Sequence, residues 1–104
     1  MSYLLLFHPE FEHDVTRMVL FIAEQAGEEA ALQASDRADE ALASLAGNPH
    51  RAAPRDDIMR GLRIALFRHS GVIPYLVDDA REEALILGVF YGGQEWDRHI
   101  LTRR

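Results

Sequence analysis

Apolar residues recur along this chain in two rhythms, and the rhythm changes near residue 60. In residues 11–25 they are spaced 4, 3 and 4 positions apart, which is the spacing of one face of an α-helix. They are Phe11, Val15, Met18 and Ile22. Residues 28–45 repeat the pattern with a stripe of mostly small side chains, namely Ala34, Ala38, Ala41, Leu42 and Leu45. Small residues let helices approach closely, so the two segments predict an antiparallel helical hairpin that turns at Gly27.

Beyond residue 60 the apolar residues recur at every second position, which predicts β-strands. Three strands with short turns between them, an antiparallel meander, are expected at residues 62–67, 72–77 and 84–91. Pro74 lies inside the second of these strands. Because proline has no N–H to donate to a sheet, we expect that strand to be bulged or broken at this residue.

Two shorter segments complete the expected fold. Tyr3–Phe7 is a continuous apolar run, which predicts a strand buried on both faces. Trp96, Ile100 and Leu101 have the spacing of a short C-terminal helix. The element order is then β-α-α-β-β-β-α, a single α+β domain over residues 1–104. Its helical hairpin should pack on one face of a small, mainly antiparallel sheet and bury its remaining apolar residues, including Leu20, Phe21 and Leu32.

The amino-acid composition and the distribution of charge exclude some classes of function. The 104 residues include no cysteine, which excludes disulfides and thiolate catalysis. The net charge is −6, with −7 in residues 1–50 and +1 in residues 51–104. An acidic chain is a poor general binder of nucleic acid, so any such contact should come from the second half.

Membrane and metal functions are not expected. No apolar run approaches the roughly 20 residues of a membrane span, and the N-terminus lacks the pattern of a signal peptide, so we expect a soluble cytoplasmic protein without membrane contacts. A cluster of polar residues opens the first helix and contains two histidines, His8 and His13. The two do not have the i, i+4 spacing of a metal site, and acids are ordinary at a helix start, so no metal and no cofactor is expected.

Four segments together resemble one family of proteins. They are FHPEFEHD (7–14), LAGNP (45–49), GLRIALF (61–67) and ILGVFYGGQ (86–94). In this order and at these spacings they resemble the RelE/ParE superfamily of bacterial toxins from type II toxin–antitoxin systems. The resemblance implies a small growth-inhibiting protein that a cognate antitoxin, encoded beside it, wraps around and holds inactive. RelE-like members cut messenger RNA on the ribosome, whereas ParE-like members are associated with inhibition of DNA gyrase.

Basic residues distinguish the two branches, because a metal-free RNA-cutting site needs cations around the phosphate. Arg63 matches one basic position of the RelE-like pattern. Three further positions that the pattern makes basic are occupied here by Ala65, Val72 and Gly93. The absence of these three basic residues favours the ParE-like branch. We therefore expect the protein to bind a macromolecular target, with DNA gyrase as the target by analogy.

The residues expected to contact that target are Arg60, Arg63, Arg68, Tyr91, Gln94, Trp96 and Arg98. The alternative is a ribosome-dependent mRNA endonuclease, with Arg63, Arg68, His69 and Tyr91 as the candidate catalytic residues. A further alternative is a non-toxic relative that acts as a partner-binding module. The acidic first half predicts that an antitoxin segment docking there carries Arg or Lys.

Overall fold

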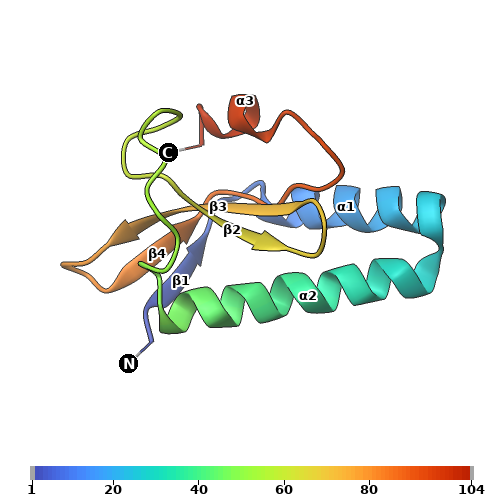
Figure 1. Ribbon diagram of the computed structural model, residues 1–104, viewed down its shortest axis with the longest axis horizontal. Helices are drawn as coiled ribbons and strands as arrows, with labels where there is room; N and C mark the ends of the chain where they lie inside the picture. The colour runs from blue at the N-terminus through green and yellow to red at the C-terminus, as the bar shows by residue number, and fades with distance from the viewer. Residues whose placement is uncertain (1, 104) are drawn as a thin grey trace.

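The computed structural model describes residues 2–103 and has the expected element order (Figure 1). The elements are β1 (Leu4–Phe7), α1 (Phe11–Ala26), α2 (Glu28–Gly47), β2 (Arg63–Phe67), β3 (Gly71–Asp78), β4 (Glu83–Ile86) and α3 (Trp96–Ile100). The α+β class, the helical hairpin and the short C-terminal helix are confirmed. None of the helices within residues 2–103 is long and apolar enough to cross a membrane.

The strands form one sheet in the order β1-β4-β3-β2. The β2–β3 and β3–β4 pairs are antiparallel, while β1 lies parallel to β4 at one edge. The α1–α2 hairpin covers one face of the sheet, and α3 lies on the other (Figure 1). Each face therefore has its own core, a larger one under the hairpin and a smaller one under α3.

The hairpin packs as its apolar stripes predict. Met18 and Ile22 of α1 and Ala34 and Ala38 of α2 are buried against the sheet. The small side chains of α2 bring the two helices close together. Gly27 joins them with φ of 95°, a left-handed conformation that glycine adopts without steric cost.

The strand at Tyr3–Phe7 is not buried on both faces, so that prediction is wrong. β1 is an edge strand, and Leu4 remains 60% exposed, because α3 covers the middle of the sheet and does not reach this edge. The expected burial of Leu20, Phe21 and Leu32 is also wrong, because these side chains are 59%, 42% and 67% exposed. The chain by itself thus leaves several large apolar side chains in water.

Pro74 does not break its strand; the expected bulge is present in this pairing, but it lies in the partner strand and not in residues 72–77. β3 runs through Pro74, and the irregularity lies in the partner strand. Tyr75 pairs with Ile86 and Val72 pairs with Phe90, so three steps along β3 are matched by four along its partner. The extra residue is a β-bulge at residues 87–89, opposite the proline.

Pro74 and the bulge each leave one backbone group without a ladder partner. Leu87 donates its N–H to the Pro74 carbonyl (2.9 Å), but Pro74 has no N–H to return to the Leu87 carbonyl. Arg103 fills that vacancy, because its Nη1 donates to the Leu87 carbonyl at 3.1 Å. The N–H of Val89 donates to Oδ2 of Asp14 at 3.3 Å.

Asp14 and Arg103 also bind each other, although 89 residues separate them in the chain. Nη1 of Arg103 lies 2.5 Å from Oδ2 of Asp14, and Nη2 lies 3.2 Å from Oδ1. Asp14 is 2% exposed and Arg103 is 8% exposed, so the pair is shielded from water. A Cβ added to Gly88 would lie 2.6 Å from both Nη1 of Arg103 and Oδ2 of Asp14. Glycine is therefore required where the bulge meets the ion pair.

Replacing Arg103 should destabilise the chain strongly, because it leaves a buried carboxylate and an unpaired carbonyl. For Arg103→Ala we expect a loss on the order of 3–5 kcal/mol in the free energy of unfolding, measured by urea denaturation. Arg98→Ala, which removes an exposed arginine of α3, is the matched control and should change stability by less than about 0.5 kcal/mol. Equal losses in the two variants would contradict the role given to Arg103.

Candidate functional site

Beyond Phe90 the chain leaves the sheet and crosses its outer face as the C-terminal arm, residues 91–103 (Figure 1). Ile100 of α3 is fully buried in the smaller core. The ring of His99 stacks on Phe90 with centroids 5.7 Å apart. Arg103 then closes the arm onto α1 and the bulge. The arm is thus fixed at both ends and forms one wall of a surface hollow.

This hollow, here called the arm cleft, lies between the β2–β3 turn and the arm and has a volume of about 290 Å³. Its apolar lining comes from Leu66, Val72, Phe90 and Trp96. Its polar and backbone lining comes from Arg68, His69, Ser70, Gly71, Tyr91, Gly93 and Gln94. The cleft is therefore mainly apolar inside, with polar groups along its rim.

The glycine pair after Tyr91 shapes one end of the cleft. Gly92 and Gly93 both take positive φ, 72° and 80°, which is the conformation required by a tight turn of this hand. The side chain of Gln94 accepts the N–H of Tyr91 (3.1 Å), and the hydroxyl of Ser70 accepts the N–H of Gly92 (3.3 Å). Gln94 and Ser70 thus hold the turn in place at the edge of the cleft.

The structure brings most of the predicted site residues together in the arm cleft. Arg68, His69, Tyr91, Gln94 and Trp96 all line it. Nη1 of Arg68 donates to the carbonyl of Ala30 in α2 at 3.0 Å, so its guanidinium lies toward the hairpin. Trp96 is half-buried and packs on the smaller core, which makes it both a core residue and a wall of the cleft.

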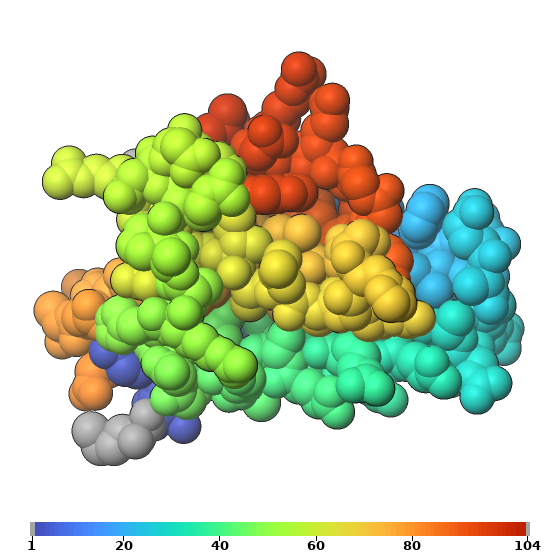
Figure 2. All heavy atoms as spheres, viewed as in Figure 1, coloured from blue at the N-terminus to red at the C-terminus, as the bar shows by residue number. Residues whose placement is uncertain are grey.

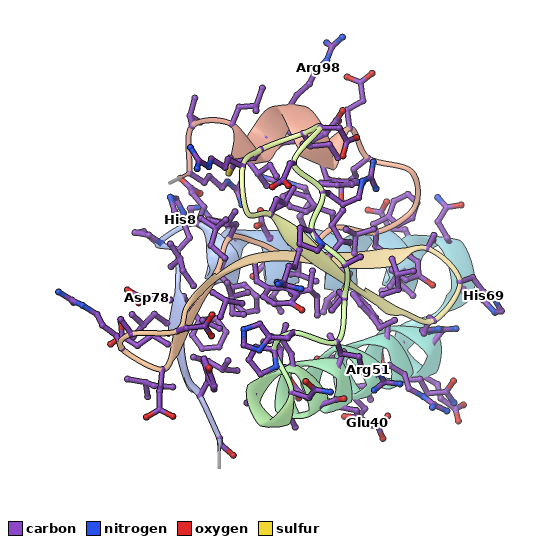
Figure 3. All side chains as sticks on the ribbon, turned by 60° about the vertical axis from the view of Figure 1, so that its left-hand side comes forward. His8, Glu40, Arg51, His69, Asp78 and Arg98 are labelled. Carbon is purple, nitrogen blue, oxygen red and sulfur yellow. The ribbon has the colours of Figure 1, made fainter. Side chains whose placement is uncertain are left out.

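Arg60, Arg63 and Arg98 do not line the cleft. The guanidinium of Arg63 donates to the carbonyls of His50 and Ala52, which fixes the loop after α2 to β2. Arg98 pairs with Glu95 at 3.4 Å on the exposed side of α3, far from His69 at the tip of the β2–β3 turn (Figure 3). Arg60 is exposed in the turn before β2. The sequence identified these arginines as basic, but it could not indicate the direction of each side chain.

The lining limits the chemistry that the cleft can support. Arg68 is its one arginine, and a single guanidinium already bonded to a carbonyl gives little compensation for phosphate charge. Val72 and Gly93, two of the positions that the RelE-like pattern makes basic, line the cleft, whereas Ala65 lies on the hairpin side of β2. Residues 2–103 contain no cluster of His, Asp or Glu that could hold a metal ion.

A second polar cluster, missed by sequence reasoning, joins three segments at the other end of the sheet. Asp79, in the β3–β4 turn, accepts a hydrogen bond from the hydroxyl of Tyr3 (2.7 Å) and lies 2.7 Å from Nε2 of His50. The Tyr3 hydroxyl first, and then His50, hold the pKa of the Asp79 carboxyl below its usual range. All three side chains are at the surface, and only the tertiary fold brings them together.

Comparison with known families places the sequence with toxins. A family model described as the ParE toxin of the type II toxin–antitoxin system parDE matches residues 5–96, which is most of the chain. No curated protein sequence matches the chain.

Three solved structures with the same fold are of toxins or toxin–antitoxin systems. A chain of the chromosomal ParDE system from P. aeruginosa has a TM-score of 0.72 at 20% identity, covering 86% of this chain and 96% of its own. A chain of the RelBE2 toxin–antitoxin complex from Mycobacterium tuberculosis has a TM-score of 0.61 at 20% identity, covering 88% and 100%. A mutant of the E. coli toxin RelE in its free state has a TM-score of 0.63 at 16% identity, covering 95% and 93%.

Removing the Tyr3 hydroxyl should raise the pKa of Asp79. The carboxylate would lose its main hydrogen-bond donor, so its pKa in Tyr3→Phe should move toward the ordinary value of about 3.9. Titration of the Asp79 carboxyl carbon by NMR measures the change, and Tyr91→Phe, distant from Asp79, should leave it unaltered. Because the folded pKa lies below the unfolded one, this bond stabilises the chain above the unfolded pKa and is lost as the pH falls through the folded pKa. An unchanged Asp79 pKa in Tyr3→Phe would refute the assignment.

Proposed function

The chain belongs to the ParE family of toxins from type II toxin–antitoxin systems, and on this premise we propose that it inhibits growth by binding a macromolecular target through the arm cleft, without catalysis of its own. The proposed target is DNA gyrase, by analogy with ParE-like toxins. A cognate antitoxin is the proposed partner that neutralises it.

The observation that carries the proposal is the composition of the arm cleft. Leu66, Val72, Phe90 and Trp96 offer apolar and aromatic surface, while Arg68 and His69 add a polar rim. Apolar centres with an aromatic residue and an arginine at the rim are typical of protein-binding surfaces. A site for cutting RNA would present more cations toward the phosphate than this cleft does.

The surface of the hairpin supports the antitoxin partnership. Leu20 and Leu32 are 59% and 67% exposed, and acids such as Glu24, Glu28 and Asp36 are exposed on the same two helices. Exposed apolar groups among like charges are typical of an interaction surface. An antitoxin segment with apolar residues and Arg or Lys would cover the apolar groups and neutralise the acids.

Purified protein should inhibit DNA supercoiling by gyrase. Charge reversal on the cleft rim, Arg68→Glu, should weaken inhibition by about tenfold, equivalent to ~1.4 kcal/mol. Arg81→Glu in the β3–β4 turn makes the same charge change outside the cleft and should inhibit like the parent. No inhibition by the parent at a large excess over gyrase would eliminate gyrase as the target, and equal weakening by both variants would eliminate the cleft.

The alternative function, ribosome-dependent mRNA cleavage, is favoured by one observation. Arg68, His69 and Tyr91, three of the four candidate catalytic residues, line the same cleft. His69 and Tyr91 could exchange protons with the 2′-hydroxyl and the leaving oxygen while Arg68 contacts the phosphate.

Primer extension on translated messages should show no new cut ends after induction if the chain acts by binding alone. New ends that vanish in His69→Ala and Tyr91→Phe, with the fold intact, would instead establish the nuclease. Induction of the chain alone should also arrest bacterial growth, and co-expression of the adjacent small gene should restore it. Normal growth with abundant soluble protein would favour a non-toxic, partner-binding relative.

A further inference from the structure

A second hollow lies on the hairpin side of the β2–β3 turn, between that turn and α2, and is here called the arginine hollow. It has a volume of about 300 Å³. Its lining consists of Gln33 and Arg37 from α2 and of Arg68 and His69 from the turn. Figure 2 shows the turn (gold) directly against α2 (teal) on this face of the molecule. Within residues 2–103, the residues that line it are all polar and none is acidic, in contrast with the mainly apolar arm cleft.

The backbone brings these side chains together from two elements. Gln33 and Arg37 lie one helical turn apart on the same face of α2. Arg68 has φ of 51°, a left-handed conformation that is uncommon for a residue other than glycine. Its Nη1 donates to the carbonyl of Ala30, one turn before Gln33, at 3.0 Å. This bond holds the guanidinium of Arg68 against the face of α2 that carries Gln33 and Arg37.

Both guanidinium groups have donors available for a ligand. Nη1 of Arg37 lies 3.8 Å from Oε2 of Glu40, and these two side chains are 64% and 70% exposed. That distance is too long for a hydrogen bond, and an exposed pair of this kind contributes little. Arg68 is bonded to the Ala30 carbonyl, but a guanidinium carries several N–H donors, so the same group can also contact an anion.

The arginine hollow is a local concentration of positive charge on an acidic part of the chain. Residues 1–50 carry a net charge of −7 and only two arginines, Arg17 and Arg37. One of these two lies where Arg68 approaches α2. Two like charges that line one hollow repel each other, and an anion bound between them would relieve the repulsion. The arrangement therefore favours a negatively charged ligand.

We propose that the arginine hollow binds a phosphate dianion, either inorganic phosphate or the terminal phosphate of a monoester. The guanidinium groups of Arg37 and Arg68 match its two negative charges, and their fork geometry suits phosphate oxygens. The amide of Gln33 and the imidazole of His69 can donate to the remaining oxygens. The lining has no apolar side chain against which a base could stack, so the phosphate itself is the recognised group.

The proposed phosphate site does not depend on the target-binding function of the arm cleft. Arg68 and His69 line both hollows, but Gln33 and Arg37 line the arginine hollow and not the arm cleft. Substitutions on α2 can therefore test phosphate binding while the arm cleft keeps its lining. All four side chains are exposed, so we expect weak binding with a dissociation constant on the order of 1 mM.

An NMR titration of the full chain with sodium phosphate, in a phosphate-free starting buffer, tests the site directly. Sodium chloride keeps the ionic strength constant, so that general screening does not change during the titration. The signals of Gln33, Arg37, Arg68 and His69 should shift along one saturating curve. Sodium chloride alone, over the same range of ionic strength, should leave them in place. Equal shifts with chloride, or shifts confined to other parts of the chain, would overturn the proposal.

Removal of one arginine separates a specific site from general charge attraction. Arg37→Ala should weaken phosphate binding at least about tenfold, and alanine at an exposed helix position preserves the fold. Arg81→Ala in the β3–β4 turn removes the same charge outside the hollow and should bind phosphate like the parent. Parent-like affinity in Arg37→Ala, or equal weakening in the two variants, would contradict a site built by Arg37.

A substitution that should tighten binding provides an independent test. Glu40→Gln removes the carboxylate beside Arg37 and keeps the size of the side chain. Phosphate affinity should rise by about two- to threefold, because the guanidinium no longer has a competing anion near it. Unchanged or weaker binding in this variant would count against Arg37 as a phosphate ligand.

A second titration distinguishes the dianion from the backbone of a nucleic acid. Its probe is a short single-stranded DNA oligonucleotide without a terminal phosphate, whose diester groups each carry a single charge. At equal phosphate concentration and ionic strength, the oligonucleotide should shift the signals of Gln33 and Arg37 less than inorganic phosphate does. Tighter binding of the oligonucleotide at the same residues would overturn the dianion and assign the hollow to nucleic acid.

Discussion

The buried ion pair between Asp14 and Arg103 is the interaction on which the rest of this structure depends. Its origin is Pro74, which cannot donate to the neighbouring strand and lies opposite a bulge. The missing N–H of Pro74 leaves the carbonyl of Leu87 without a donor, and the bulge leaves the N–H of Val89 without an acceptor in the sheet. A buried unpaired group costs about 1–3 kcal/mol. Arg103 satisfies the first and Asp14 the second. The two charges then neutralise each other, so one pair compensates for both defects.

The same pair determines where the C-terminal arm lies, and through the arm it shapes the cleft. Arg103 is next to the last residue of the chain, and it fixes the arm to the start of α1. The arm in turn carries Gln94 and Trp96, which form one wall of the arm cleft. The β-bulge in the middle of the sheet thus helps to determine the shape of the arm cleft at the surface. The coupling works only because Gly88 lets the guanidinium and the carboxylate approach the bulge.

Sequence patterns predicted the elements better than their surroundings. The stripe from Phe11 to Ile22 and the alternation in β2 report local geometry, and both were confirmed. Burial depends on what covers an element, which periodicity does not record. For this reason the apolar run of β1 was expected in the core and lies at an edge. The bulge was not predicted, because the alternating pattern of residues 84–91 continues without interruption in the sequence. In the structure, the extra residue near Gly88 changes the face of the sheet on which the following side chains lie.

The candidate site shows the same division between local and tertiary information. Tyr91, Gln94 and Trp96 are close in sequence, and Arg68 and His69 sit in one turn, so their two groups could be recognised locally. From the sequence alone, Arg63 and Arg68 were both candidate site residues. Its place in β2 directs it toward the hairpin side of the sheet, where the carbonyls of His50 and Ala52 take its guanidinium. The Tyr3–Asp79 contact spans 76 positions and has no local signal.

The apolar residues that the chain leaves exposed connect this physical account with the proposed partnership. A sheet of four short strands has two edges, and its one hairpin covers a single face, so Leu4, Leu20, Leu32 and Leu66 stay in water. Folding the chain alone cannot bury them, because the arm is already fixed to the middle of the outer face. A partner that wraps around the chain would cover edge and hairpin together. Acids on the hairpin would then orient that partner, since they attract basic residues.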